Sequence, residues 1–173
     1  MTVLSRHAPE TLWEDGELVL SRGVWNGEPL LAAAPSSAQP SPGTLARLQH
    51  AYTLREELDP AWAARPLRLE LHKGRLTLLS EDPGGEPLTR LLGRPWQIAS
   101  FLRVGVGLAT ALAGLHERGL IHKDIKPANI LVKAGTGAVW LMGFGIASRL
   151  PRERQAPAPP EVIAGTLAYM APE

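Results

Sequence analysis

His122-Lys123-Asp124-Ile125-Lys126-Pro127-Ala128-Asn129 is the stretch of the sequence from which the fold can be identified. It follows a long run of apolar residues at helical spacing, and two short apolar runs, 130–132 and 138–141, come after it and predict strands. Its histidine, aspartate, lysine, proline and asparagine fit a fixed pattern. With each residue type near about 5% usage, a chance match is on the order of one in a few million per starting point. The stretch therefore predicts a specialised loop between a helix and two strands.

A second motif spans residues 165–173 and reads GTLAYMAPE. Together the two motifs resemble the catalytic loop H-R-D-x-K-P-x-N and the later G-T-x-x-Y-M-A-P-E of the eukaryotic-type Ser/Thr protein kinase family, in the same order. Residues 54–70 (LREELDPAWAARPLRLE) and 143–155 (GFGIASRLPRERQ) further resemble the kinase-like N-terminal module of large bacterial multidomain sensor histidine kinases.

This resemblance implies an α+β, two-lobed protein-kinase-like fold. Residues 1–85 are expected to form the upper lobe, an antiparallel sheet with one helix, and to include a hinge at Glu81 to Gly85. Residues 86–173 are expected to form part of a helical lower lobe, through the activation segment. Because kinases of this family have a longer lower lobe, the resemblance implies a fragment truncated at the Ala171-Pro172-Glu173 motif.

Composition excludes several classes of function. The chain of 173 residues has 18 basic and 17 acidic residues, so its net charge of +1 gives no indication of nucleic-acid binding. It contains no cysteine, which removes disulfides, thiol catalysis and cysteine-ligated metal. The first ten residues show no secretory signal pattern. The resemblance implies a cytoplasmic bacterial signalling protein that acts on a protein substrate or contacts partner domains of a larger chain.

The apolar stretch Ile98 to Leu115 has the composition of either a membrane span or a core helix. Arg103 interrupts it and leaves Val104 to Leu115 as its longest uncharged run, whereas a span needs about 20 apolar residues. We therefore predict a core helix and no membrane segment. Its expected core positions recur at helical spacing and are Ile98, Phe101, Leu102, Leu108, Leu112 and Leu115.

The N-terminal half predicts two strands within residues 12–31, a helix over 44–58, and strands at 67–71 and 76–79. Kinases carry a glycine-rich loop between two early strands, because glycine lets backbone amides approach the ATP phosphates. Here Gly23 and Gly27 are the candidates for such a cover, although their G-x-x-x-G spacing is equally typical of an ordinary hairpin.

The resemblance assigns chemical roles to residues of the 122–129 stretch. Asp124 matches the catalytic base that orients the attacking hydroxyl, and Lys126 matches the lysine that contacts the transferred phosphate. Asn129 matches the ligand of a magnesium ion, and Glu81 lies in the hinge that binds the nucleotide. The cofactors implied are ATP and Mg²⁺, both bound weakly because other parts of the site are missing.

Two groups that phosphoryl transfer needs are absent from the sequence. Gly143 stands where the family has a metal-binding aspartate, and no aspartate follows Asp124. Kinases also hold the phosphates with a lysine on the third strand, whereas this chain has no lysine before Lys73. That lysine's place falls to one of three residues, Ala32, Ala33 or Ala34.

Two further features of the sequence also indicate impaired catalysis. The glutamate that would pair with the lysine is replaced by Ala51 in the closest alignment, with Glu56 and Glu57 as later alternatives. Residues 149–165 contain no Ser, Thr or Tyr, which excludes activation by phosphorylation there. Two functions stay open: a Ser/Thr protein kinase domain with impaired catalysis, and a non-catalytic pseudokinase module that regulates or binds partners.

Overall fold

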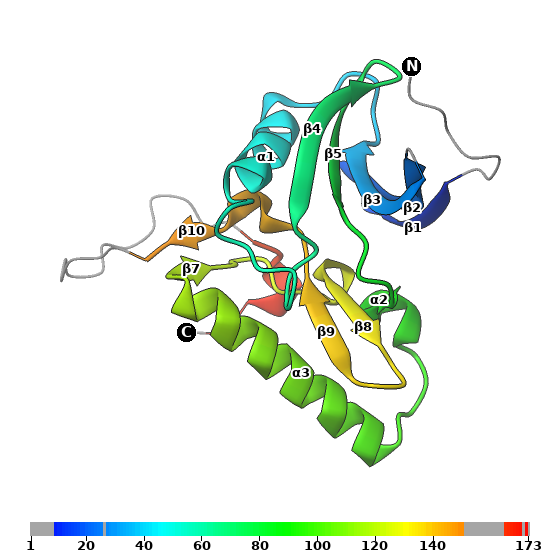
Figure 1. The fold of residues 1–173 in the computed structure, drawn as a ribbon, viewed down its shortest axis with the longest axis vertical. Coiled ribbons are helices and arrows are strands. Elements are labelled where there is room, and N and C mark those ends of the chain that lie inside the picture. The colour runs from blue at the N-terminus through cyan, green and yellow to red at the C-terminus, as the bar shows by residue number, and fades with distance from the viewer. Residues whose placement is uncertain (1–8, 26, 151–164, 171, 173) are drawn as a thin grey trace.

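The structure is a computed structural model that describes residues 9–25, 27–150, 165–170 and 172. Its larger sheet consists of the strands β1 (Glu10–Glu14), β2 (Leu18–Trp25), β3 (Glu28–Pro35), β4 (Pro66–His72) and β5 (Arg75–Glu81). These strands pair antiparallel in the order β1-β2-β3-β5-β4. The sheet and one helix beside it form the upper lobe (Figure 1).

The helix of the upper lobe, α1 (Pro42–Thr53), packs against the sheet. Ser41 caps its first turn, because the Ser41 hydroxyl accepts a backbone N–H at 3.1 Å. The sequence predicted an end at Leu58, but the helix ends at Thr53. Residues 54–57 continue in turns with hydrogen bonds to carbonyls three residues back. This tighter winding brings Leu54 and Leu58 into the core, where neither is more than 4% exposed.

The lower lobe follows β5 in the chain. It contains the helices α2 (Leu88–Leu91) and α3 (Ile98–Glu117), the short strands β6 (Glu86–Pro87), β7 (Leu120–Ile121), β8 (Ile130–Lys133), β9 (Ala138–Leu141) and β10 (Ser148–Arg149), and the 3-10 turns η1 (Pro127–Asn129), η2 (Phe144–Ile146) and η3 (Leu167–Tyr169). One antiparallel sheet joins β6, β8 and β9, and β7 pairs with β10. α3 runs along the outer edge of this lobe, below β8 and β9 (Figure 1).

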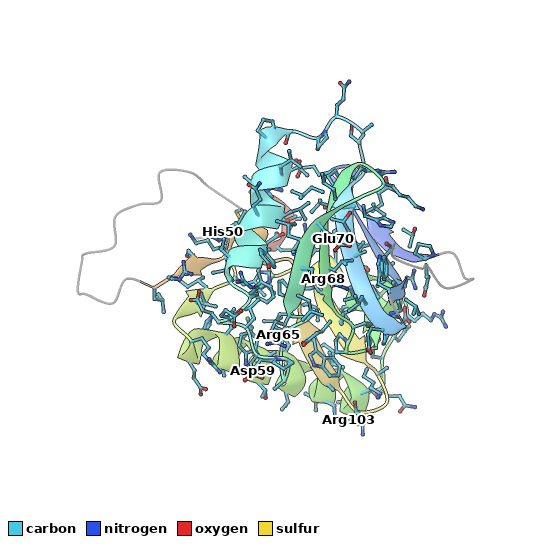
Figure 2. All side chains as sticks on the ribbon, turned by 45° about the horizontal axis from the view of Figure 1, so that its top comes forward. His50, Asp59, Arg65, Arg68, Glu70 and Arg103 are labelled. Atoms are coloured by element: carbon cyan, nitrogen blue, oxygen red, sulfur yellow. The ribbon has the colours of Figure 1, made fainter. Side chains whose placement is uncertain are left out.

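The segment between α1 and β4 ties the two lobes together, and Figure 2 labels Asp59 and Arg65 on it. The N–H of Ala64 donates to the Leu141 carbonyl at 2.9 Å, and the N–H of Leu141 donates to the Trp62 carbonyl at 2.8 Å. A continuous apolar cluster runs through the same region and takes residues from α1, β5, α3, β8, β9 and η2. The two lobes are therefore joined by backbone hydrogen bonds and by packed apolar side chains.

Most of the predicted architecture is confirmed. The α+β class, the antiparallel upper sheet and the strands at 67–71, 76–79, 130–132 and 138–141 are all found. The number of N-terminal strands was predicted wrongly: residues 10–35 form three strands rather than two, because β1 precedes the predicted pair. The division of the chain at residue 85, which falls between β5 and β6, stays a prediction.

α3 is less buried than the sequence predicted. Three of its expected core positions are between 57% and 76% exposed, namely Ile98, Phe101 and Leu102. The other three pack against the core, namely Leu108, Leu112 and Leu115. The difference arises because no described element lies on the first face, whereas the second face packs against β9. By length and composition alone α3 could cross a membrane, and in this structure it packs against β9 and β7.

Candidate functional site

A cavity of about 140 Å³ lies between the upper sheet and the 122–129 loop. Strands β2, β3 and β5 wall it from above, α1 closes one side, and the loop and η2 form its lower wall. Its lining includes Asp15, Leu31, Ala33, Leu48, Ala51, Ser80, Asp124, Lys126, Asn129, Gly143 and Thr166. Three residues to which the sequence assigned a chemical role therefore line the cavity, namely Asp124, Lys126 and Asn129.

Asp124 is the centre of a connected polar cluster. The Thr166 hydroxyl donates to its Oδ1 at 2.6 Å, and the Asn129 Nδ2 donates to its Oδ2 at 2.9 Å and to its carbonyl at 2.8 Å. The Lys126 Nζ lies 3.2 Å from Oδ2 and also donates to Thr166 Oγ1 at 3.2 Å. Residues from the loop and from the 165–170 segment are thus held in one geometry.

The cluster keeps the Asp124 carboxylate ionised. Burial alone would raise the pKa of this carboxyl, but the hydrogen bond from Thr166 and the charge of Lys126 outweigh burial and hold the pKa below its usual value. An ionised carboxylate in this position can accept a hydrogen bond from a hydroxyl group in the cavity. The arrangement can therefore orient an alcohol for attack.

His122 anchors the loop and takes no direct part in the cavity. It is 1% exposed, and its Nε2–H donates to the Met142 carbonyl at 2.9 Å. Its Nδ1 accepts the Asp124 N–H at 3.2 Å, which fixes the neutral tautomer. Burial lowers the pKa of His122, because the charged imidazolium would lose its hydration, and this outweighs the hydrogen bond to the Met142 carbonyl, which raises the pKa. The ring also lies 4.9 Å from that of Phe144.

Gly143 supplies no second carboxylate beside Asn129, whose one carboxylate partner among the described residues is Asp124. It adopts the left-handed conformation, with φ 81° and ψ 39°, and a Cβ there would lie 2.6 Å from the Asn129 Cγ. The Asn129 amide nitrogen is directed at Asp124. Within the described ranges, no group of three His, Cys, Asp or Glu side chains could hold a metal ion. Because Mg²⁺ prefers carboxylate oxygens, these residues do not fit the implied magnesium ion.

The structure decides which alanine takes the place of the third-strand lysine. Leu31 and Ala33 line the cavity from β3, because alternate residues of a strand face the same side. Ala32 faces the opposite side of the sheet and packs with Trp25 and Leu79. Ala33 is therefore the position from which a side chain would reach the cavity.

α1 contributes an apolar wall. Leu48 and Ala51 line the cavity, and both are buried. Neither of the alternative glutamates lines the cavity. Glu57 accepts a hydrogen bond from the Arg149 Nε–H at 3.0 Å, and Glu56 is exposed. The position opposite Ala33 thus holds no acidic side chain from α1.

The two glycines predicted as a phosphate cover lie elsewhere. Gly23 is inside β2 and Gly27 is in the β2–β3 turn, and neither lines the cavity. This corrects the expectation, because the turn beside the cavity is the earlier one, between β1 and β2. Asp15 lines the cavity from that turn, and its Oδ1 accepts the N–H groups of Glu17 at 3.1 Å and Leu18 at 3.0 Å. Two backbone amides of this turn are therefore already bound to a carboxylate.

The hinge residues are also engaged within the protein. Glu81 accepts a hydrogen bond from Arg65 at 2.7 Å and does not line the cavity. Arg22 binds Asp82 with both Nε and Nη2, at 2.6 and 3.1 Å, and donates to the Gly85 carbonyl at 2.7 Å. Arg22 therefore fastens β2 to the hinge and is not placed to hold a ligand.

Sequence reasoning missed Asp15, Arg47 and Thr166. Thr166 lies within the GTLAYMAPE motif, so the motif itself could have identified it. Asp15 precedes a glycine in a short acidic run, a turn signal that was available. Nothing in the sequence marks Arg47, which lines the cavity and pairs with Glu17 at 2.8 Å. The expected activation segment lies largely outside the described residues, since 151–164 are not among them.

Comparison with known proteins gives one matching family. The family described as "Protein kinase domain" matches residues 69–173. CBL-interacting protein kinase 4 of Oryza sativa subsp. japonica is 32% identical over 166 residues, which cover 91% of this chain and 36% of that protein.

Two bacterial proteins are also similar. The serine/threonine-protein kinase PknD of Protochlamydia amoebophila is 30% identical over 143 residues, covering 70% of this chain and 14% of PknD. A probable serine/threonine-protein kinase of Corynebacterium efficiens is 37% identical over 79 residues, covering 46% of this chain and 12% of that protein. The chain spans between 12% and 36% of the length of these three relatives.

Proposed function

The chain belongs to the protein kinase domain family, and on this premise we propose that it is a kinase-fold regulatory and interaction module whose phosphoryl transfer is impaired. Kinases of this family use ATP and Mg²⁺, and transfer depends on holding the phosphates while a hydroxyl attacks. We propose that this chain binds ATP weakly and with little dependence on Mg²⁺.

One observation carries the proposal: among the residues that the structure describes, each cationic side chain on the cavity wall is already paired with a carboxylate. Arg47 lies 2.8 Å from Glu17, and Lys126 lies 3.2 Å from Asp124. Ala33 adds no charge from the sheet. A triphosphate would have to compete with these carboxylates for the same cations, in a cavity that also contains Asp15 and Asp124.

A Ser/Thr protein kinase with impaired catalysis is the second candidate. The cluster around Asp124 favours it, because an ionised carboxylate, Lys126 and Thr166 are already assembled. In such an enzyme Asp124 would orient the substrate hydroxyl and Lys126 would face the transferred phosphate. The two candidates differ in whether the phosphates can be held at all.

Titration calorimetry with ATP, in Mg²⁺ and in a chelator, tests the proposal. We expect a dissociation constant of about 1 mM or weaker in both conditions, because the interactions that would be specific to the phosphates and the metal are missing. A low-micromolar affinity that disappears with the chelator would contradict this account of the site. Phosphate transfer to a generic Ser/Thr peptide is measured in parallel. Transfer that depends on Asp124, and is lost in Asp124→Asn, would support the second candidate instead.

We also propose that the chain works in the cytoplasm and contacts partner domains of a larger signalling protein. The support is indirect: the relatives are several times longer than the matched region, and the net charge of +1 does not favour nucleic acid. Co-purification of the parent protein's other domains with this chain tests the proposal. Failure of every such domain to co-purify would refute it.

A further inference from the structure

We propose that the cavity between the lobes binds a small uncharged molecule with one or two aromatic rings. The proposal rests on the proposed function, because it takes the loss of phosphate handling as its starting point. It goes beyond that function by assigning the cavity a class of ligand.

The first argument is the apolar character of the cavity's back wall. Leu48 and Ala51 come from α1, Ala33 from β3, Leu78 from β5, and Phe144 from η2. The two alanines face the cavity with single methyl groups, so the wall recedes where a lysine and its acidic partner would otherwise stand. An aromatic ring placed there would contact apolar atoms from four separate elements.

The second argument is the balance of charge. In the described part of the chain four ionisable side chains line the cavity, Asp15, Arg47, Asp124 and Lys126, two of each sign. Each already has a partner within the protein: Asp15 accepts two backbone N–H groups, Arg47 binds Glu17, and Asp124 binds Lys126. A charged ligand would lose its hydration without gaining a free counter-charge, whereas an uncharged ligand avoids this cost.

The third argument is size. The cavity of about 140 Å³ is close in volume to an apolar protein cavity of about 150 Å³ that binds benzene. Polar groups remain at the wall, including the hydroxyls of Ser80 and Thr166, and these can orient a ring that carries one donor or acceptor. The volume and the lining therefore favour a molecule of one or two rings over a nucleoside triphosphate.

The test compares three probes that share one ring system, using the 173-residue chain. Indole is uncharged, indole-3-acetate adds a carboxylate, and tryptamine adds an ammonium group. We expect saturable binding of indole by calorimetry, with each charged analogue at least about tenfold weaker. Tighter binding of indole-3-acetate, of tryptamine or of ATP than of indole would overturn the proposal.

Matched variants locate the site. Ala33→Leu fills the cavity from β3 and is expected to weaken indole binding by at least about tenfold. The control is Ala34→Leu, the same change at the next residue, which does not line the cavity and is expected to leave binding unchanged. Ala51→Leu fills the cavity from α1 and replaces Ala33→Leu if that variant does not fold.

Three outcomes separate this proposal from the proposed function. Unchanged indole affinity in Ala33→Leu and Ala51→Leu would overturn the inference, because the ring would then bind elsewhere, for example on the exposed face of α3 at Phe101 and Leu102. Absence of indole binding would overturn the inference and leave the proposed function intact. Tight ATP binding with phosphate transfer would overturn the proposed function itself.

Discussion

Restoring the missing carboxylate with Gly143→Asp should destabilise the domain and should not produce kinase activity. Gly143 has a φ of 81°, and the left-handed conformation costs a residue with a side chain about 1–2 kcal/mol. The new Cβ would also lie 2.6 Å from the Asn129 Cγ, so Asn129 must move. Moving it breaks its two hydrogen bonds to Asp124, at 2.8 and 2.9 Å. Hydrogen bonds of this kind contribute about 1–2 kcal/mol each.

Together these costs amount to about 3–6 kcal/mol of unfolding free energy. In a domain of this size 1 kcal/mol corresponds to about 2–4 °C, so the melting temperature should fall by about 10 °C. Gly16→Asp is the matched control, because Gly16 also has a positive φ, 86°, but a Cβ there would meet nothing within 4 Å. We expect Gly16→Asp to lower the melting temperature by only about 3 °C.

Activity is measured as phosphate transfer to a generic Ser/Thr peptide. The single variant should remain inactive, because groups that act together in catalysis are not repaired one at a time. The informative comparison adds a lysine at Ala33, which faces the cavity, or at Ala34, which does not line it. Robust transfer by Gly143→Asp alone would refute the reasoning. It would mean that another cation holds the phosphates, although Arg22 is bound to Asp82.

Two further predictions concern stability. In α3, Gly105→Ala should stabilise the domain by about 1 kcal/mol, because a Cβ there meets nothing within 4 Å. Gly107→Ala and Gly114→Ala should each destabilise it by about 2 kcal/mol, since the new Cβ would meet a backbone carbonyl of the β8–β9 turn at 107 and the Trp62 ring at 114. Urea unfolding of the three variants checks this order of stabilities. A Gly114→Ala variant more stable than the parent would contradict the prediction. His122 has a lowered pKa, so the folded state binds fewer protons than the unfolded chain below pH 6.5. The unfolding free energy should therefore fall with decreasing pH, by up to about 1.4 kcal/mol per unit, and an equally steep fall in His122→Gln would exclude this cause.

The sequence by itself determined the fold class and the two main losses of the site. Residues 122–129 form the predicted loop between a helix and two strands. The motif could be recognised because its residues are adjacent in the chain. The absence of an aspartate after Asp124 and of a lysine before Lys73 holds in any alignment. The polar cluster around Asp124 was recognisable because Asp124, Lys126 and Asn129 lie within six residues of one another.

The tertiary structure decided which residues face the cavity. Side chains of a strand alternate between its two sides, so a shift of one residue exchanges Ala32 for Ala33, and the sequence does not fix that register. The pairing of Arg22 with Asp82 and of Arg47 with Glu17 was equally beyond the sequence, because these partners are 60 and 30 residues apart. Such contacts depend on how strands and helices pack in space, and that packing determines which charges remain available to a ligand.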